Sequence, residues 1–266
     1  MRIKTALTIA GSDSGGGAGI QADIKSFAAF GVYGTSALTA ITAQNTRGVH
    51  GVMRVPPEMV TAQIRAVLDD IPPDAIKIGM LGGAAVVEAV AEALAGYECP
   101  LVLDPVMVAK SGDALLDDAA VDALATLLIP RATILTPNLP EAARLLGLSQ
   151  ATTAAEIVAQ GRALLDLGPT AVLMKGGHAT GPHCTDRLIT QAGVHEVTGP
   201  RIATRNTHGT GCSLSAALAA LLATGRTPEA ALERAQSWLS GAIRAADRLG
   251  IGSGHGPVDH FHEGRR

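Results

Sequence analysis

The sequence ALTIAGSDSGGGAG at residues 6–19 joins a short apolar run to a loop that holds five glycines. An apolar run of this length, bounded by glycine, is typical of a strand buried on both faces of a parallel sheet. The loop has more glycines than a single tight turn requires, which favours a backbone that approaches a ligand closely. We therefore expect a buried strand at residues 6–10 followed by a ligand-binding loop, with an ordinary glycine-rich turn as the alternative.

The same apolar pattern returns at residues 76–79, 101–103, 134–135 and 171–174. Apolar residues at helical spacing lie between these runs and after them, over residues 60–71 and 214–222. This alternation predicts an α/β fold with a doubly wound, mostly parallel central sheet and helices on both faces. Residues 184–202 carry turn signals, and we expect there a pair of antiparallel strands at one edge of the sheet.

Length and composition indicate one globular domain. The chain has 266 residues, is 47% hydrophobic and 17% charged, and contains no repeat, linker or low-complexity block. Its apolar content is sufficient for a buried core and its charge is too low for a disordered chain. We expect residues 1–266 to form a single domain without a separate large lid domain.

Charge and cysteine content exclude several classes of protein. The net charge is −3 and aromatic residues make up only 2%, whereas nucleic-acid binding uses basic faces and aromatic platforms. No apolar run approaches the roughly 20 residues that a membrane span needs, and the start of the chain becomes polar too early for a signal peptide. The three cysteines lie far apart and fit a reducing compartment. We therefore expect a cytoplasmic protein with neither nucleic-acid nor membrane partners.

Polar or glycine-rich residues follow each apolar run directly. Ligands of doubly wound sheets bind beyond the carboxyl ends of the strands, so these residues form the candidate site. They are the loop at 11–19, Met80, and residues 104–106, 138–141, 175–178 and 206–212. The chain lacks GxxxxGK[ST], GxGxxG and GxSxG, which excludes the P-loop, the usual dinucleotide fingerprint and the hydrolase nucleophile elbow.

The most informative local signal is Gly209-Thr210-Gly211-Cys212, which opens the leucine-rich helix. Glycines allow close approach of the backbone, and a helix N-terminus offers unpaired N–H groups and partial positive charge. This pattern predicts a site for a phosphate or a transferring phosphoryl group; an ordinary loop entering a buried helix is the alternative. Lys175 ends an apolar run and either reaches phosphate oxygens as a point charge or is a solvated surface lysine.

Acidic and amide residues at other strand ends could hold a metal or a ring. Asn138 and Glu141 stand one helical turn apart and could bind Mg²⁺, directly or through water, or form a helix cap. Asp104 is either a second acidic group near that metal or the cap of the following turn. Asp23 and Gln44 are polar residues in apolar surroundings that could also lie on the surface. The donor and acceptor of Gln44 suit the edge of an amidine-like heterocycle.

Taken together and in order, these motifs resemble the hydroxymethylpyrimidine/phosphomethylpyrimidine kinases of thiamine biosynthesis. The resemblance extends over essentially the full chain, through residues 6–23, 42–46, 77–81, 103–107, 136–142, 174–178, 206–212, 254–258 and 260–262. It implies a ribokinase-like fold, ATP and Mg²⁺ as cofactors, and a homodimer. The implied reaction is phosphorylation of 4-amino-5-hydroxymethyl-2-methylpyrimidine and then of its monophosphate. Gly15 departs from the family pattern, in which serine is frequent at this position.

Carried over residue by residue, the resemblance gives each motif a role. Gln44 would bind the aminopyrimidine edge, with Gly11, Asp23, Met80 and Val106 nearby. The ATP phosphates and Mg²⁺ would be served by Lys175, Asn138, Glu141 and Asp104, with the two carboxylates acting on Mg²⁺ through water. Gly209, Thr210 and Gly211 would form the anion hole, and Cys212 would lie beside the reacting hydroxyl.

Cys212 stands where most ribokinase-like sugar kinases carry an aspartate base. The second acceptor in the implied pathway is itself a phosphate and needs no deprotonation by an enzyme base. A carboxylate about 4 Å away would repel that phosphate by about 4 kcal/mol per unit charge at an effective dielectric near 20. A free thiol has a pKa of about 8.5 and can act as a base or stay neutral. We expect a mostly neutral thiol that avoids this repulsion.

Two other functions remain open from the sequence. A pyridoxal or pyridoxine kinase would act on a similar ring with a hydroxymethyl arm, although Gln44 favours the aminopyrimidine. A non-catalytic pyrimidine-binding module is less consistent with the residues, because Lys175, Glu141 and the loop at 209–212 would have no use in it.

Overall fold

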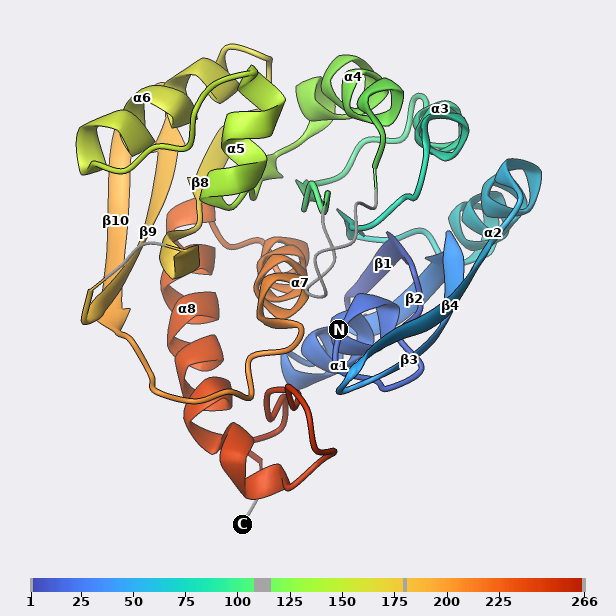
Figure 1. The fold of residues 1–266 in the computed structure, drawn as a ribbon. Coiled ribbons are helices and arrows are strands. Elements are labelled where there is room, and N and C mark those ends of the chain that lie inside the picture. The colour runs from blue at the N-terminus through green and yellow to red at the C-terminus, as the bar shows by residue number, and fades with distance from the viewer. Residues whose placement is uncertain (1, 108–115, 179–180, 265–266) are drawn as a thin grey trace.

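The computed structural model describes residues 2–107, 116–178 and 181–264, and it shows a central sheet flanked by helices (Figure 1). The strands are β1 (Thr5–Ala10), β2 (Tyr33–Leu38), β3 (Ala40–Asn45), β4 (Gly48–Arg54), β5 (Ala75–Ile78), β6 (Leu101–Leu103), β7 (Ile134–Leu135), β8 (Ala171–Met174), β9 (His183–Thr190) and β10 (Gly193–Pro200). The helices are α1 (Gly19–Ala29), α2 (Pro57–Asp70), α3 (Ala84–Ala93), α4 (Asp118–Leu127), α5 (Leu139–Leu146), α6 (Ala154–Leu165), α7 (Thr210–Ala223) and α8 (Pro228–Ala245).

The main sheet of this described part has the strand order β10-β9-β8-β7-β6-β5-β1-β2. All neighbouring strands from β2 to β8 are parallel, whereas β8 pairs antiparallel with β9, and β9 with β10. The predicted mostly parallel, doubly wound sheet is therefore confirmed, and so is the antiparallel pair at its edge. All five apolar runs form strands of this sheet.

Local signals explain where individual helices begin and end. The side chain of Thr153 caps α6 by accepting a hydrogen bond from the Glu156 amide, and the Glu156 carboxylate in turn accepts one from the Thr153 amide. In α8 the Thr227 hydroxyl caps the helix and Pro228 occupies the first position, where no N–H is needed. Gly147 ends α5 with φ of 64°, a conformation in which a side chain is strained.

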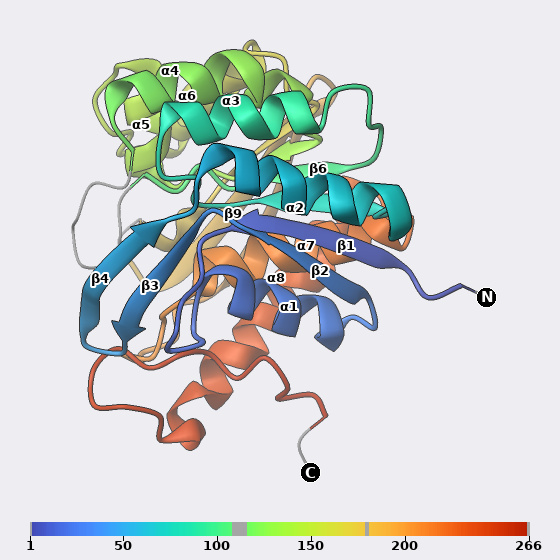
Figure 2. The same ribbon diagram turned by 90° about the vertical axis from the view of Figure 1, so that its right-hand side faces the viewer.

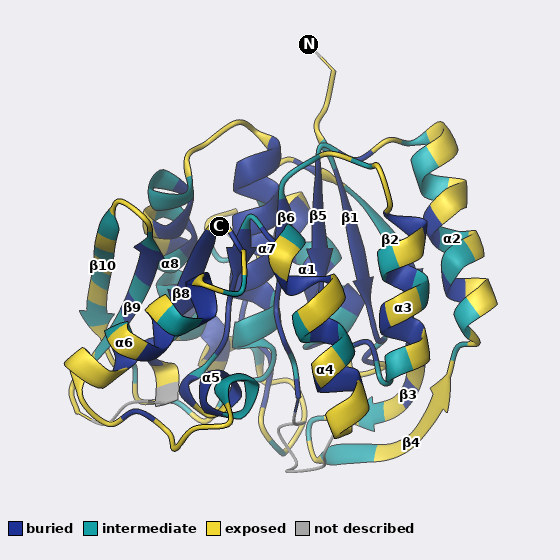
Figure 3. Ribbon diagram, turned by 90° about the horizontal axis from the view of Figure 1, so that it is seen from above, coloured by how far each residue is buried: buried dark blue, intermediate teal, exposed yellow. Residues whose placement is uncertain are grey.

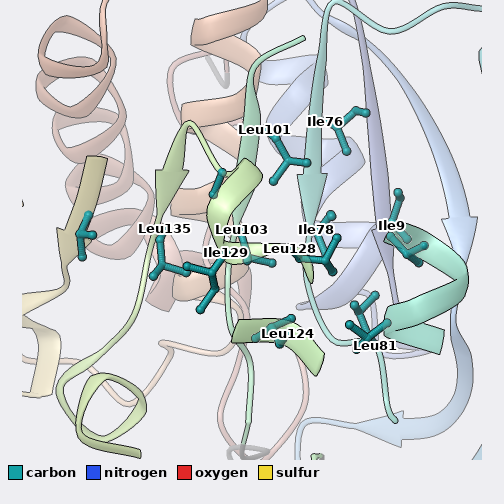
Figure 4. Close-up of a cluster of buried hydrophobic side chains, with 14 of the residues drawn as sticks. Ile9, Ile76, Ile78, Leu81, Leu101, Leu103, Leu124, Leu128, Ile129 and Leu135 are labelled. Atoms are coloured by element: carbon teal, nitrogen blue, oxygen red, sulfur yellow. The ribbon is translucent and has the colours of Figure 1, made fainter. Parts of the chain in front are cut away.

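The helices cover the two faces of the sheet, with α2 to α6 on one side and α1, α7 and α8 on the other (Figure 2). The first face buries aliphatic side chains of four adjacent strands, including Ile9, Ile76, Ile78, Leu101, Leu103 and Leu135 (Figure 4). On the second face α7 is buried along most of its length (Figure 3). The N-terminus of α7 lies at the carboxyl edge of the sheet, near Lys175 and Asp104, which follow β8 and β6.

Two further features bear on function. Strands β3 and β4 form a separate antiparallel ribbon, with an irregular register between Ala43 and Gln44, that the sequence pattern had not predicted. The ribbon extends from the edge of the molecule near α1 (Figure 2). Within the described residues no helix has the length and apolar character of a membrane span.

Candidate active site

Two glycine loops from opposite ends of the chain interlock at the start of α7. Gly209 has φ of 78° and lies so close to the carbonyl oxygen of Gly17 that a Cβ at this position would overlap it. A Cβ on Gly17 would in turn come 2.5 Å from Cδ2 of His208. Both positions therefore require glycine, and the first glycine loop (residues 11–19) is held against the α7 entry loop (residues 206–209).

The N-terminus of α7 faces this junction without a side-chain cap. The Thr210 hydroxyl is directed to the carbonyl of Thr207, and a Cβ on Gly211 would lie 3.6 Å from Nζ of Lys175. The Lys175 ammonium therefore lies close to the first turn of α7. This arrangement is suited to an anion, as the sequence predicted for residues 209–211.

Lys175 follows β8 and is largely buried, with 13% of its side chain exposed. Its ammonium donates to Oδ1 of Asp104 at 2.7 Å and lies 3.8 Å from Oε2 of Glu141. Burial alone would lower the pKa of Lys175, but the two carboxylates outweigh it and raise that pKa. The alternative of a solvated surface lysine is therefore wrong.

Asp104 follows β6 and is 1% exposed. Its carboxylate accepts hydrogen bonds from Lys175, from the Thr136 hydroxyl at 3.2 Å and from the Ser215 hydroxyl at 3.2 Å. Burial opposes ionisation, yet the nearby ammoniums of Lys175 and Lys77 hold the pKa of Asp104 below its usual value. Ser215 lies on α7, so this carboxylate links the end of β6 to the helix that carries the anion site.

Asn138 and Glu141 form a capping box at the start of α5. The Glu141 amide donates to Oδ1 of Asn138 at 2.9 Å, and the Asn138 amide donates to Oε2 of Glu141 at 2.8 Å. The helix-cap alternative is thus confirmed, while the carboxylate still faces Lys175. Burial, opposed by Lys175 and reinforced by Asp104, raises the pKa of Glu141 to about 7. Among the described residues no group of three histidine, cysteine or acidic side chains could enclose a metal, so any ion held here by Asp104 and Glu141 keeps much of its water.

Cys212 lies in the first turn of α7, and the backbone N–H of Gly19 faces its sulfur. Burial raises the pKa of the Cys212 thiol to about 11, although the Lys77 ammonium opposes this shift. The thiol is therefore protonated at neutral pH, in agreement with the neutral group expected from the sequence.

The substrate-side residues occupy the neighbouring loops. Gly11 and Met80 are in contact, since a Cβ on Gly11 would lie 2.5 Å from Cε of Met80, and the Val106 amide donates to the Asp104 carbonyl. Gln44 is half-buried at the end of β3, with its Nε2 at 3.4 Å from Nε2 of His208. Because His208 directly precedes Gly209, this contact places Gln44 beside the entry loop of α7.

Asp23 lies within electrostatic range of Cys212 and is fully buried, so the alternative of a surface residue is wrong. Its side chain is 0% exposed, and Oδ2 accepts from Nζ of Lys77 at 2.8 Å and from the Thr8 hydroxyl at 2.6 Å. Lys77 is equally buried, and the Asp23 carboxylate raises its pKa against the effect of burial. Asp23 therefore acts in this structure as the partner of a buried ammonium rather than as an exposed part of the site wall.

Comparisons with known proteins agree with this geometry. The model of the family described as phosphomethylpyrimidine kinase matches residues 13–259. The chain is 53% identical over 263 residues to the hydroxymethylpyrimidine/phosphomethylpyrimidine kinase of Escherichia coli K12, covering 98% of this chain and 99% of the relative. The chain belongs to the phosphomethylpyrimidine kinase family.

Solved structures support the assignment of the fold. A phosphomethylpyrimidine kinase from Clostridium difficile 630 superposes with a TM-score of 0.80 at 42% identity, over 90% of this chain and 99% of that one. A pyridoxal kinase from Staphylococcus aureus, in complex with AMP-PCP and pyridoxal, superposes with a TM-score of 0.91 at 33% identity, over 100% of this chain and 96% of that one. The ribokinase-like fold is thereby confirmed.

Sequence reasoning missed two elements of this kinase site. Lys77 interacts electrostatically with Cys212 from inside the sheet, and a lysine within an otherwise apolar strand was a usable signal for it. The second element is a side-chain contact between Asp13 and His208, at 2.8 Å between Oδ2 and Nε2, which joins the two glycine loops. No sequence signal pairs residues so far apart.

Proposed function

We propose that this chain transfers the γ-phosphoryl group of ATP to the hydroxymethyl oxygen of 4-amino-5-hydroxymethyl-2-methylpyrimidine, and then phosphorylates the monophosphate, in thiamine biosynthesis. One observation carries the proposal: the uncapped start of α7, Lys175 and Gln44 lie around one loop. A module that only binds a pyrimidine would not need the uncapped start of α7 or Lys175. The names of the relatives support the choice of ring and of both steps.

The residues of the chain supply charge and position. Phosphoryl transfer passes through a loose transition state whose charge lies on the equatorial oxygens, so oriented N–H groups and cations stabilise it most. The first amides of α7 face those oxygens, and Lys175 exchanges Asp104 for a phosphate oxygen when the nucleotide binds. Asp104, which also accepts from the Ser215 hydroxyl, holds the lysine in place beforehand.

Cys212 contributes through its neutral thiol. In a loose transition state the acceptor hydroxyl needs a base only late in the transfer. A thiol with a pKa of about 11 is neutral and does not repel the negative charge of a monophosphate acceptor. Gln44 binds the amino group and the ring nitrogen of the pyrimidine, with Gly11, Met80 and Val106 nearby.

The donors near Lys175 fit Mg²⁺ held through water. Asp104 and Glu141 are hard oxygen ligands that both face the same ammonium, and together they carry one negative charge more than Lys175 neutralises when both are ionised. When bound, Mg²⁺ would neutralise charge on the nucleotide phosphates. Glu141 and Asp104 would hold its water shell.

Further properties of this kinase are part of the same proposal. ATP as donor is supported by the complexes of related pyridoxal kinases with AMP-PCP and ADP. We propose that residues 1–266 act as one kinase domain, since the main sheet takes strands from residues 5 to 200. We also propose a cytoplasmic homodimer; sedimentation at micromolar concentration tests its dimeric state.

An ADP-release assay tests the proposed function. Purified protein receives ATP and Mg²⁺ with the hydroxymethylpyrimidine, its monophosphate or pyridoxal in parallel. We expect the largest kcat/KM for the hydroxymethylpyrimidine and clear turnover of its monophosphate. A larger kcat/KM for pyridoxal would instead favour the pyridoxal kinase function, to which several solved relatives belong. Binding of the pyrimidine without ADP release would indicate a non-catalytic module.

A further inference from the structure

Asp13 and His208 form a buried pair between the two glycine loops, in contact with Gln44. Oδ2 of Asp13 lies 2.8 Å from Nε2 of His208, and the side chains are 3% and 13% exposed. The same carboxylate accepts from the amides of Gly15, Gly17 and Ala18 at 2.8, 3.0 and 2.8 Å. These bonds keep it ionised, and His208 helps to hold the pKa of Asp13 below its usual value against the effect of burial.

An ionised carboxylate at this distance fixes the tautomer of His208. Asp13 can only accept, so the proton of the imidazole lies on Nε2 and is directed at Oδ2. Nε2 itself lies 3.4 Å from the Gln44 carboxamide and, because it carries the proton, offers no lone pair to an N–H of that group. An acceptor is favourable at that position and an NH₂ group is not, because two donors would face each other.

The other side of the Gln44 carboxamide leads to the same orientation. Oγ1 of Thr42 lies 3.2 Å from Oε1 of Gln44 and 2.8 Å from the carbonyl oxygen of Ser12. The single hydroxyl proton of Thr42 goes to Ser12, whose carbonyl can only accept, so Thr42 presents a lone pair to Gln44. Turning the carboxamide by 180° puts its oxygen toward His208 and its NH₂ group toward Thr42, so that the two donors no longer face each other and Thr42 accepts one amide hydrogen.

We propose that the Asp13–His208 pair fixes the orientation of the Gln44 carboxamide and thereby makes the site select one order of donor and acceptor on the ring. His208 is thus a positioning residue that determines specificity, one residue away from the anion site. The inference rests on the proposed function, since it assumes that Gln44 reads the ring edge. A 4-aminopyrimidine presents a donor beside the acceptor N3, whereas its 4-oxo counterpart presents an acceptor beside the donor N3–H, which is the reverse order.

The experiment compares kcat/KM for 4-amino-5-hydroxymethyl-2-methylpyrimidine and its 4-oxo counterpart in four proteins. The wild type prefers the amino compound. His208→Leu removes the Nε2–H and lowers that preference by about tenfold, mainly through better use of the oxo compound, because the carboxamide can now turn. His208→Gln, which can place an N–H at the same point, retains the preference. His255→Leu is the control, since the imidazole of His255 lies at the Arg205 carbonyl, with Nδ1 at 3.1 Å from that oxygen.

An unchanged preference in His208→Leu, with the wild type discriminating normally, would overturn the inference and leave the proposed function intact. A wild type that phosphorylates neither ring would overturn the proposed function, and the inference with it. Nitrogen-15 NMR of the wild-type imidazole gives a readout that does not depend on folding of a variant. We expect the Nε2–H tautomer for neutral His208; an Nδ1–H tautomer would contradict the inference.

Discussion

Lys77 and Lys175 are both buried lysines that bind a carboxylate beside Cys212, but their surroundings differ. Lys77 and Asp23 are each 0% exposed, so one ammonium and one carboxylate form a closed, neutral pair. Lys175 is 13% exposed and faces two carboxylates, Asp104 and Glu141. The buried Lys77–Asp23 pair has no net charge, so its separation is unfavourable. The Lys175 cluster is accessible and carries net negative charge when both carboxylates are ionised, so an added cation or proton stabilises it. The first pair fixes the charge around Cys212, and the second can exchange partners during the reaction.

The largest expected effect concerns the closed pair. Lys77→Met leaves Asp23 buried without its counter-ion, and we expect the free energy of unfolding to fall by about 3–5 kcal/mol. The double variant Lys77→Met/Asp23→Leu should recover most of this loss, because no charge remains buried. Urea unfolding measures both. A single-variant loss below about 1 kcal/mol would show that the pair is not closed to water.

Lys175→Met should lower catalytic activity more than it lowers stability. Loss of a cation that faces the transferring phosphoryl group should lower kcat by about 10²–10³-fold. Stability should fall less than in Lys77→Met, because Glu141 can take up a proton and relieve the remaining negative charge. Parallel kinetics and urea unfolding test this contrast. Equal losses of stability in the two variants would remove the distinction between the pairs.

Cys212→Asp adds a fixed carboxylate between the two lysines. The monophosphate carries its own negative charge, so the second phosphorylation should slow by about tenfold more than the first, after the repulsion is reduced by the nearby ammoniums. Cys212→Ser, which adds no charge, is the matched control and should slow both steps similarly. Single-turnover rates for the two acceptors measure this; equal losses in Cys212→Asp would contradict a role for the neutral thiol.

The smallest effect is a pH dependence of Mg²⁺ binding. Glu141 has a pKa of about 7, so protons compete with the ion more strongly as the pH falls. Apparent Mg²⁺ affinity should weaken by about tenfold between pH 8 and pH 6, as expected for one competing proton. Glu141→Gln preserves the capping box and should flatten this dependence. An unchanged slope in the variant would exclude Glu141 as the titrating group.

The accuracy of the sequence predictions follows from the range of the interactions involved. Apolar runs bounded by glycine, proline or aspartate located the parallel strands β1, β5, β6, β7 and β8, because burial on both faces imposes that pattern locally. The parallel strand β2 was missed, because it is mostly half-buried and carries no such run. The β3–β4 ribbon was missed since its strands are partly exposed and carry no such run. Gly209–Cys212 and Lys175 were found from their position after strands or before a helix. The contact between Asp13 and His208 was not predicted, because these residues are far apart in the sequence and only the folded chain brings them together.

The most direct test of the contrast between the two lysines is a crystal structure with AMP-PCP, Mg²⁺ and the hydroxymethylpyrimidine bound. We expect Nζ of Lys175 within about 3 Å of a phosphate oxygen, having left Asp104, while Nζ of Lys77 remains on Asp23. Lys175 still bound to Asp104, with the phosphates elsewhere, would contradict the assignment of an exchanging and a fixed lysine.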